Sequence, residues 1–223
     1  MMDWSAFALS IQLALGTLAV LLPVGLLVGR WLARTPFKGR TWLEAAILLP
    51  LVLPPTVMGY YLLVALGGAS PVGQWLQNSF GISLTFNFTG LLLASVVFNI
   101  PFMIQPIQRA FESIPMNLNE AAQVSGLSTW AIFTKVELPL AWPGILSAIV
   151  LTFVHTLGEF GVVLMIGGSI PGETRTLAIS IYDSVQSFDL NAANTMSLAL
   201  LVFSLVAVAS SLWLSGRRKR PVQ

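Results

Sequence analysis

The chain has 223 residues, of which 56% are hydrophobic and only 9% are charged, and its formal net charge is +2. Ordinary soluble domains are about 45–50% apolar and about 25% charged, so this composition is that of a membrane protein. The absence of cysteine excludes disulfides and thiolate metal sites, and a single histidine excludes a histidine-cluster metal site, so we expect no cofactor.

Five apolar stretches are long enough to cross a bilayer, which needs about 20 mainly apolar residues per helix. They lie at about 7–32, 45–66, 88–110, 143–166 and 196–213. No charged residue lies between Asp3 and Arg30 or between Glu44 and Arg109, and a soluble core does not avoid charge over such runs. We therefore predict an all-α fold, a polytopic helical bundle with about five transmembrane helices in a single domain over residues 1–223.

Prolines interrupt two of these stretches. They are Pro50, Pro54 and Pro55 in the second and Pro101 and Pro106 in the third. Each removes a helix hydrogen bond and tends to bend or break the helix. Two interpretations remain open, which are a translocation path lined by hinged helices and static kinks that serve only packing.

Basic residues are concentrated on one side of the expected topology. All Lys and Arg residues except Arg175 follow the first span, follow the third span or lie in the tail 217–220. Because Lys and Arg stay on the cytoplasmic side, we expect the N-terminus outside and the C-terminus inside. The basic excess thus reflects membrane sidedness and does not indicate nucleic-acid binding. The tail is read as a stop-transfer anchor, with a lipid-binding patch as the alternative.

A polar segment at 115–139 separates the third and fourth spans on the cytoplasmic side. Asn117 and Glu120 have the spacing of a capping box, and Gly126 suits the left-handed residue that ends a helix. Ser128 is placed to cap a second helix, which we expect Pro139 and Pro143 to close as the chain re-enters the membrane. Such a helix–turn–helix, with small residues exposed, suits docking into the groove of another protein.

The spacing within this segment resembles the EAA loop of permease subunits of bacterial ABC importers. Glu120, Ala121 and Ala122 are followed after three residues by Gly126, and Leu138 and Pro139 close the motif. Val136 stands where the family usually has Ile, which is a minor departure. The resemblance implies the type I ABC-importer permease fold and a coupling helix that docks on an ATP-binding subunit. The alternative is an ordinary cytoplasmic loop that contains a capped helix.

A second resemblance concerns the transported substrate. The segment His155–Tyr182, "HTLGEFGVVLMIGGSIPGETRTLAISIY", is similar to the molybdate/tungstate permease branch of that family, with the sulfate permeases as relatives. The resemblance implies a homodimer in a bacterial inner membrane. It also implies two partners, a dimer of ATP-binding subunits and a periplasmic protein that delivers the oxyanion. ATP hydrolysis is expected in the separate subunit, because the chain has no phosphate-binding loop of the G-x-x-x-x-G-K-[ST] type.

Five polar residues are candidates for the pore, a gate or the subunit interface. Near the cytoplasmic end of the third span lie Gln105, Gln108 and Arg109, where they could meet the departing anion. The alternative for Arg109 is that its side chain snorkels from the helix end to the membrane surface and has no role in transport. His155 and Glu159 are four residues apart and are expected to share a face of the fourth span. We expect Glu159 to order the interface or gate by pairing with His155 or with exposed backbone, with a proton relay as the alternative.

The sequence leaves three functions to compare. The first is a molybdate importer permease that also takes tungstate, and the second is the same architecture carrying sulfate or thiosulfate. The third is a transporter that acts without ATP, which would show inverted repeats and charged residues at mid-membrane. We find neither repeats nor charge pairs there beyond His155 and Glu159, so the first function is favoured.

Overall fold

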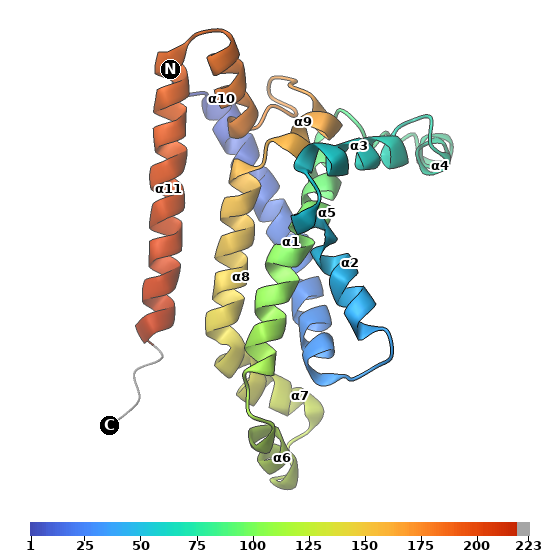
Figure 1. Ribbon diagram of the computed structural model, residues 1–223, viewed down its shortest axis with the longest axis vertical. Coiled ribbons are helices and arrows are strands. Elements are labelled where there is room, and N and C mark those ends of the chain that lie inside the picture. The colour runs from blue at the N-terminus through green and yellow to red at the C-terminus, as the bar shows by residue number, and fades with distance from the viewer. Residues whose placement is uncertain (218–223) are drawn as a thin grey trace.

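The computed structural model describes residues 1–217, and the described part of the chain is helical without strands (Figure 1). The basic tail residues Arg218, Lys219 and Arg220 lie outside the described residues. Four helical stretches are long and apolar enough to cross a membrane: α1 (Trp4–Arg34), α5 (Phe88–Glu112), Thr129–Gly158 and α11 (Leu190–Arg217). A bent helix pair brings this number to five if the pair is one span.

The expected second span at 45–66 is broken at its prolines into two helices. Helix α2 (Arg40–Val52) ends before Leu53, and α3 (Pro55–Leu66) leaves at an angle of 109°. Leu53 and Pro54 have ψ angles of 139° and 136°, the extended conformation that a following proline imposes. Pro50 lies within α2 without ending it, so the break belongs to the Pro54–Pro55 doublet.

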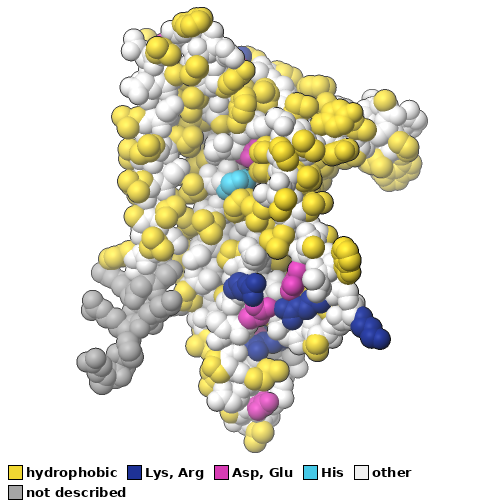
Figure 2. All heavy atoms as spheres, in the orientation of Figure 1, with side chains coloured by type: hydrophobic (Ala, Val, Ile, Leu, Met, Phe, Trp, Pro, Cys, Tyr) yellow, Lys and Arg dark blue, Asp and Glu magenta, His cyan; other side chains and the backbone are white. Residues whose placement is uncertain are grey.

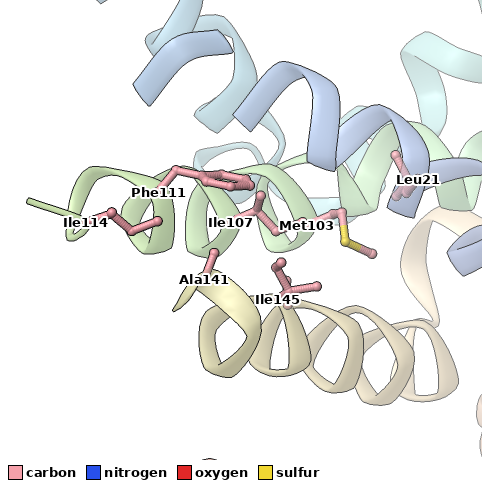
Figure 3. Packing of buried hydrophobic residues seen from close by; sticks show 8 residues of the cluster. Leu21, Met103, Ile107, Phe111, Ile114, Ala141 and Ile145 are labelled. Atoms are coloured by element: carbon pink, nitrogen blue, oxygen red, sulfur yellow. The ribbon is translucent and has the colours of Figure 1, made fainter. Parts of the chain in front are cut away.

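Helix α5 is the central helix of the bundle, and it stays continuous through Pro101 and Pro106. It contacts α1 and α8 (Leu138–Gly158) along most of its length. Figure 3 shows Met103, Ile107 and Phe111 on successive turns of α5, which runs alongside α8 with its Ala141 and Ile145. Their spacing of four residues places them on one helical face. This stripe forms the core that fixes α1, α5 and α8 relative to one another.

The fourth span is displaced relative to the predicted boundaries of 143–166. The helix begins with α7 (Thr129–Ile132), continues through a π-helical turn, η1 (Phe133–Glu137), and enters α8 without interruption. Pro139 and Pro143 were expected to close the cytoplasmic helix, but the chain stays helical through both of them from Thr129 to Gly158. At the other end α8 stops at Gly158, and a separate short helix, α9 (Gly161–Gly167), follows.

The remaining helices lie at the two ends of the bundle. Helix α6 (Met116–Val124) projects with α7 at one end, whereas α10 (Leu177–Gln186) lies at the other, beside the start of α1 (Figure 1). The Ser10 hydroxyl accepts a hydrogen bond from the Leu177 amide at 2.8 Å, which joins α1 to α10. Helix α4 (Pro71–Phe80) extends away from the bundle beyond α3.

Candidate coupling and translocation sites

The segment 115–139 forms two short helices that protrude from the bundle. Helix α6 begins at Met116 with Pro115 as its N-cap, so Asn117 lies inside the helix and the expected capping box is wrong. Gly126 has a φ of +79°, the left-handed conformation that ends α6 as predicted. The Ser128 hydroxyl accepts from the Ala131 amide at 3.3 Å and caps α7, again as predicted.

The predicted coupling residues divide into an exposed and an inward-facing set. Glu120, Ala121, Gly126 and Pro139 are exposed, whereas Ala122 is buried and Leu138 packs against the core. Large apolar side chains accompany the exposed set. They are Met116, Leu118, Val124 and Trp130, the last two 90% and 72% exposed. An apolar surface of this kind on a polar projection is typical of a protein docking site.

Glu137 is the structural anchor of this segment, although it is not one of the predicted site residues. Its side chain is only 1% exposed. Arg30 donates from Nε to Oε2 at 2.5 Å, and Arg34 Nε lies 3.3 Å from Oε1. Asn119, on α6, donates from Nδ2 to Oε1 at 3.0 Å. One buried carboxylate therefore joins the end of α1, helix α6 and the start of α8. We call these four residues the Glu137 cluster.

A sequence signal for the cluster exists. Glu137 lies on the same stripe of the helix as Trp130 and Phe133, so an acidic residue shares a face with two aromatic ones. Arg30 and Arg34 are four residues apart at the same end of the membrane. A buried carboxylate requires paired charge, and two arginines on one face supply it.

Gln108 and Arg109 belong to a second polar cluster, between α2 and α5. The Gln108 amide donates to Glu44 at 2.8 Å and to Glu112 at 2.9 Å. Glu112 also accepts from Arg40 at 2.7 Å and from Arg109 at 3.0 Å. The carboxylates of Glu44 and Glu112 balance the guanidiniums of Arg40 and Arg109. Gln108 uses its amide in contacts with the protein itself. Gln105 lines a small cavity of about 40 Å³ beside this cluster, together with Gln108 and Arg109.

His155 is the end of a chain of polar side chains through the middle of the bundle. Its Nδ1 lies 3.0 Å from Oδ1 of Asn99, and its ring stacks on Phe102 with centroids 3.8 Å apart. Asn99 donates to the Ser95 carbonyl at 2.8 Å, and the Ser95 and Thr17 hydroxyls are 2.8 Å apart. The chain crosses from α8 through α5 to α1. Figure 2 shows the single histidine on the surface at mid-height, above the face where the charged side chains gather.

Glu159 does not share a helical face with His155, because α8 ends at Gly158 and Glu159 is extended. Its Oε1 accepts a hydrogen bond from the Val162 amide at 2.9 Å. Glu159 therefore caps the first turn of α9. Of the two pairings expected for Glu159, the described residues form the one with exposed backbone.

The two helix breaks face each other. A Cβ atom at Gly161 would lie 2.7 Å from Cβ of Pro55, and one at Gly59 would lie 2.7 Å from Cβ of Met165. Helices α3 and α9 accordingly lie side by side (Figure 1). Glycine at both positions permits this close approach. Sequence reasoning identified the prolines but missed this contact, which we call the α3–α9 contact.

Comparison with known proteins shows which family this chain resembles. The model of the family "Binding-protein-dependent transport system inner membrane component" matches residues 22–220. The molybdenum transport system permease protein ModB of Azotobacter vinelandii is 44% identical over 217 residues, which cover 97% of this chain and 96% of that protein. The sulfate transport system permease protein CysT of Escherichia coli K12 is 34% identical over 198 residues, 89% of this chain and 71% of that protein.

Among solved structures, a chain of a bacterial ABC transporter that imports the acidic polysaccharide alginate matches with a TM-score of 0.78. Its sequence identity is 20%, and the match covers 97% of this chain and 79% of that chain. This likeness confirms the predicted fold, an all-α membrane bundle of the ABC-importer permease type. The family is one of permease subunits without catalytic activity, as the sequence indicated. The chain belongs to the binding-protein-dependent transport system inner membrane components, and within them to the molybdenum transport permeases.

Proposed function

We propose that this chain is the transmembrane subunit of an ATP-driven importer that carries molybdate, and with it tungstate. Similarity to molybdenum permeases over nearly the whole chain is the observation that carries this proposal. The similarity to a sulfate permease is lower and covers less of the relative. Tungstate is included because its shape and charge are nearly those of molybdate.

The proposed assembly is a homodimer with a dimer of ATP-binding subunits at one end and a periplasmic binding protein at the other. The exposed apolar residues of α6 and α7 supply the docking surface for the ATP-binding subunits. Figure 2 shows that charged side chains gather toward this same end. Because basic residues stay on the cytoplasmic side, this end faces the cytoplasm, and the N-terminus lies outside.

The route for the mechanical signal is a continuous helix. From Thr129 to Gly158 the chain is helical without a break, so a displacement of α7 is carried along α8. The helix ends at the break before Glu159, next to the α3–α9 contact. Motion of the coupling segment therefore reaches the place where two broken helices meet. We assign the gate to this contact.

The permease itself is not expected to hold molybdate tightly. Tight capture of a dianion requires several donors or an arginine, and no Lys or Arg lies within 4–29, 88–108 or 138–158. Selectivity is therefore assigned to the binding protein, and this chain supplies a gated path.

ATPase activity in lipid vesicles tests the substrate. The chain is reconstituted with its ATP-binding subunit, and binding protein loaded with molybdate, tungstate or sulfate is added. Stimulation by molybdate and tungstate but not by sulfate is the expected result. Stimulation by sulfate alone would instead support the second candidate, a sulfate permease. The 34% identity to the sulfate permease CysT is the observation that favours this candidate. Substrate uptake without an ATP-binding subunit would contradict both.

A further inference from the structure

A cavity of about 420 Å³ lies between the end of α1 and the coupling segment, beside the Glu137 cluster, with which it shares Arg30 and Arg34. Leu26, Leu27, Arg30, Trp31 and Arg34 line it from α1. Trp130 lines it from α7. Among the described residues, no acidic side chain lines the cavity, so its charged lining is basic. The cavity lies where the apolar part of α1 gives way to its first charged residues.

The charge balance around the cavity leaves one positive charge uncompensated. Within residues 1–217, which the structure describes, Arg30 and Arg34 share a single carboxylate, that of Glu137. Among the described residues, Arg30 donates to protein only through Nε, so both of its terminal nitrogens are available to a ligand. Arg34 Nη1 meets only the Met116 sulfur, at 3.7 Å, and its Nη2 is buried without a partner in the described part of the chain. This arrangement favours an anion with several acceptor oxygens.

Apart from Thr35 and Thr129 the rest of the lining is apolar, and part of it is exposed. Leu27 is 72% exposed, and Trp31 and Trp130 are also exposed. Leucine at this depth suits contact with an acyl chain, and tryptophan is enriched where a membrane meets water. Basic pockets between membrane helices on the cytoplasmic side bind anionic head groups. An inorganic anion would use the arginines but would leave the apolar wall without a function.

We propose that this cavity binds an anionic membrane phospholipid. The phosphodiester oxygens contact the terminal nitrogens of Arg30, and one acyl chain lies along Leu26 and Leu27. The lipid would then join α1 to α7 at the same level as the Glu137 cluster. The proposal concerns lipid rather than cargo, so it stands or falls independently of molybdate transport.

Native mass spectrometry of the full chain purified with its ATP-binding subunits tests the proposal. The detergent-solubilised complex is titrated with phosphatidylglycerol and with phosphatidylcholine, and the retained lipid is counted. We expect preferential retention of phosphatidylglycerol. The substitution Arg30→Gln should weaken it by about fivefold, the effect of one basic residue on an anionic lipid. Leu27→Gln keeps both arginines and the exposed position, and it should weaken retention through the acyl contact alone.

Lys38→Gln is the matched control, because Lys38 is an exposed basic residue on the α1–α2 connection and does not line the cavity. It should retain phosphatidylglycerol as the unsubstituted protein does. Equal retention of the two lipids, or an equal loss in the Lys38 and Arg30 variants, would overturn the proposal. Displacement of the lipid by millimolar inorganic phosphate would show a soluble-anion site instead. Retention of the lipid by the permease alone but not by its complex with the ATP-binding subunits would assign the cavity to that protein, again overturning the proposal.

Discussion

The Glu137 cluster and the α3–α9 contact lie at different ends of the same helix and are built by opposite means. The first is a buried carboxylate held by two arginines and an amide, with distances from 2.5 to 3.3 Å. The second is a contact of glycine backbone with proline and methionine side chains, beside two helix breaks. Charge and hydrogen-bond direction fix the geometry of the Glu137 cluster, whereas only the fit of side chains and backbone fixes that of the α3–α9 contact.

This difference suggests which part of the protein transmits motion as a rigid body and which part changes its conformation. A buried ion pair is lost at high cost when its geometry changes, so α1, α6 and the start of α8 are expected to move as one body. Packed apolar surfaces with small residues can slide past one another at lower cost. We infer that conformational change in transport is concentrated at the α3–α9 contact. The predictions below test each half of this division.

The largest effect is expected from Glu137→Gln. The substitution removes the one carboxylate that compensates Arg30 and Arg34, and breaking a buried ion pair in this way costs about 3 kcal/mol. The thermal unfolding midpoint of the purified permease should fall clearly, and transport should fall with it. A midpoint equal to that of the unsubstituted protein would show that the cluster does not hold the coupling segment.

Glu120→Gln is the matched control for this variant. Glu120 lies in the same segment but is exposed and forms no ion pair among the described residues. Its substitution should leave the unfolding midpoint unchanged and weaken co-purification of the ATP-binding subunit. Loss of stability in both variants would mean that any change of charge in this segment destabilises the protein, and that the buried ion pairs of Glu137 are not the cause.

Gly161→Ala is expected to act on the gate. The new methyl group would lie 2.7 Å from Cβ of Pro55, so the two helix breaks must move apart. Overpacking of this kind costs about 1–3 kcal/mol. Molybdate uptake into vesicles should fall severalfold while the ATP-binding subunit remains associated. Gly158→Ala is the control, because nothing lies within 4 Å of a Cβ at that position, and its uptake should be unchanged.

Glu159→Ala is expected to loosen α9 alone. It removes the oxygen that accepts from the Val162 amide, and loss of an N-cap costs about 1 kcal/mol. Hydrogen exchange at the amides of α9 should become faster. Glu159→Gln keeps an acceptor oxygen and should protect these amides nearly as well. If the Gln variant exchanges as fast as the Ala variant, the negative charge and not the cap is what matters.

The sequence predicted those features that depend on local chemistry. Apolar length and charge gaps located α1, α5 and α11, and the polar segment was recognised with its turn at Gly126. Prolines were a weaker guide. Pro54 and Pro55 are adjacent and force two successive extended residues, whereas Pro101 and Pro106 each remove only one hydrogen bond from a helix that is packed on both sides. The sequence shows both kinds of proline, but packing decides which one breaks the helix.

Contacts between distant residues could not be predicted in the same way. Arg30 and Glu137 are 107 residues apart, and only the fold brings them together. The end of α8 was also missed, because the apolar run continues across Gly158 into α9 and nothing local marks a stop except Glu159. Both misses lie in the regions that the proposed mechanism uses, where local preference and tertiary structure differ.

The smallest effect concerns pH at the end of the bundle opposite the coupling segment. Burial acts to raise the pKa of the Asp3 carboxyl, but hydrogen bonds from the Ala6 amide and from the Ser5 and Ser180 hydroxyls outweigh it and lower this pKa below its ordinary value. A lowered pKa stabilises the folded state above the unfolded pKa, near 3.8, and this contribution is lost as the pH falls through the folded value.

Asn can still cap α1, so Asp3→Asn should cost less than about 1 kcal/mol at pH 6. Between pH 6 and pH 3 the unfolding midpoint of the Asn variant should fall less than that of the unsubstituted protein, because its own residue 3 has no proton to take up. Parallel curves would show that Asp3 joins α1 to α10 through hydrogen-bond geometry alone, without a contribution from its charge.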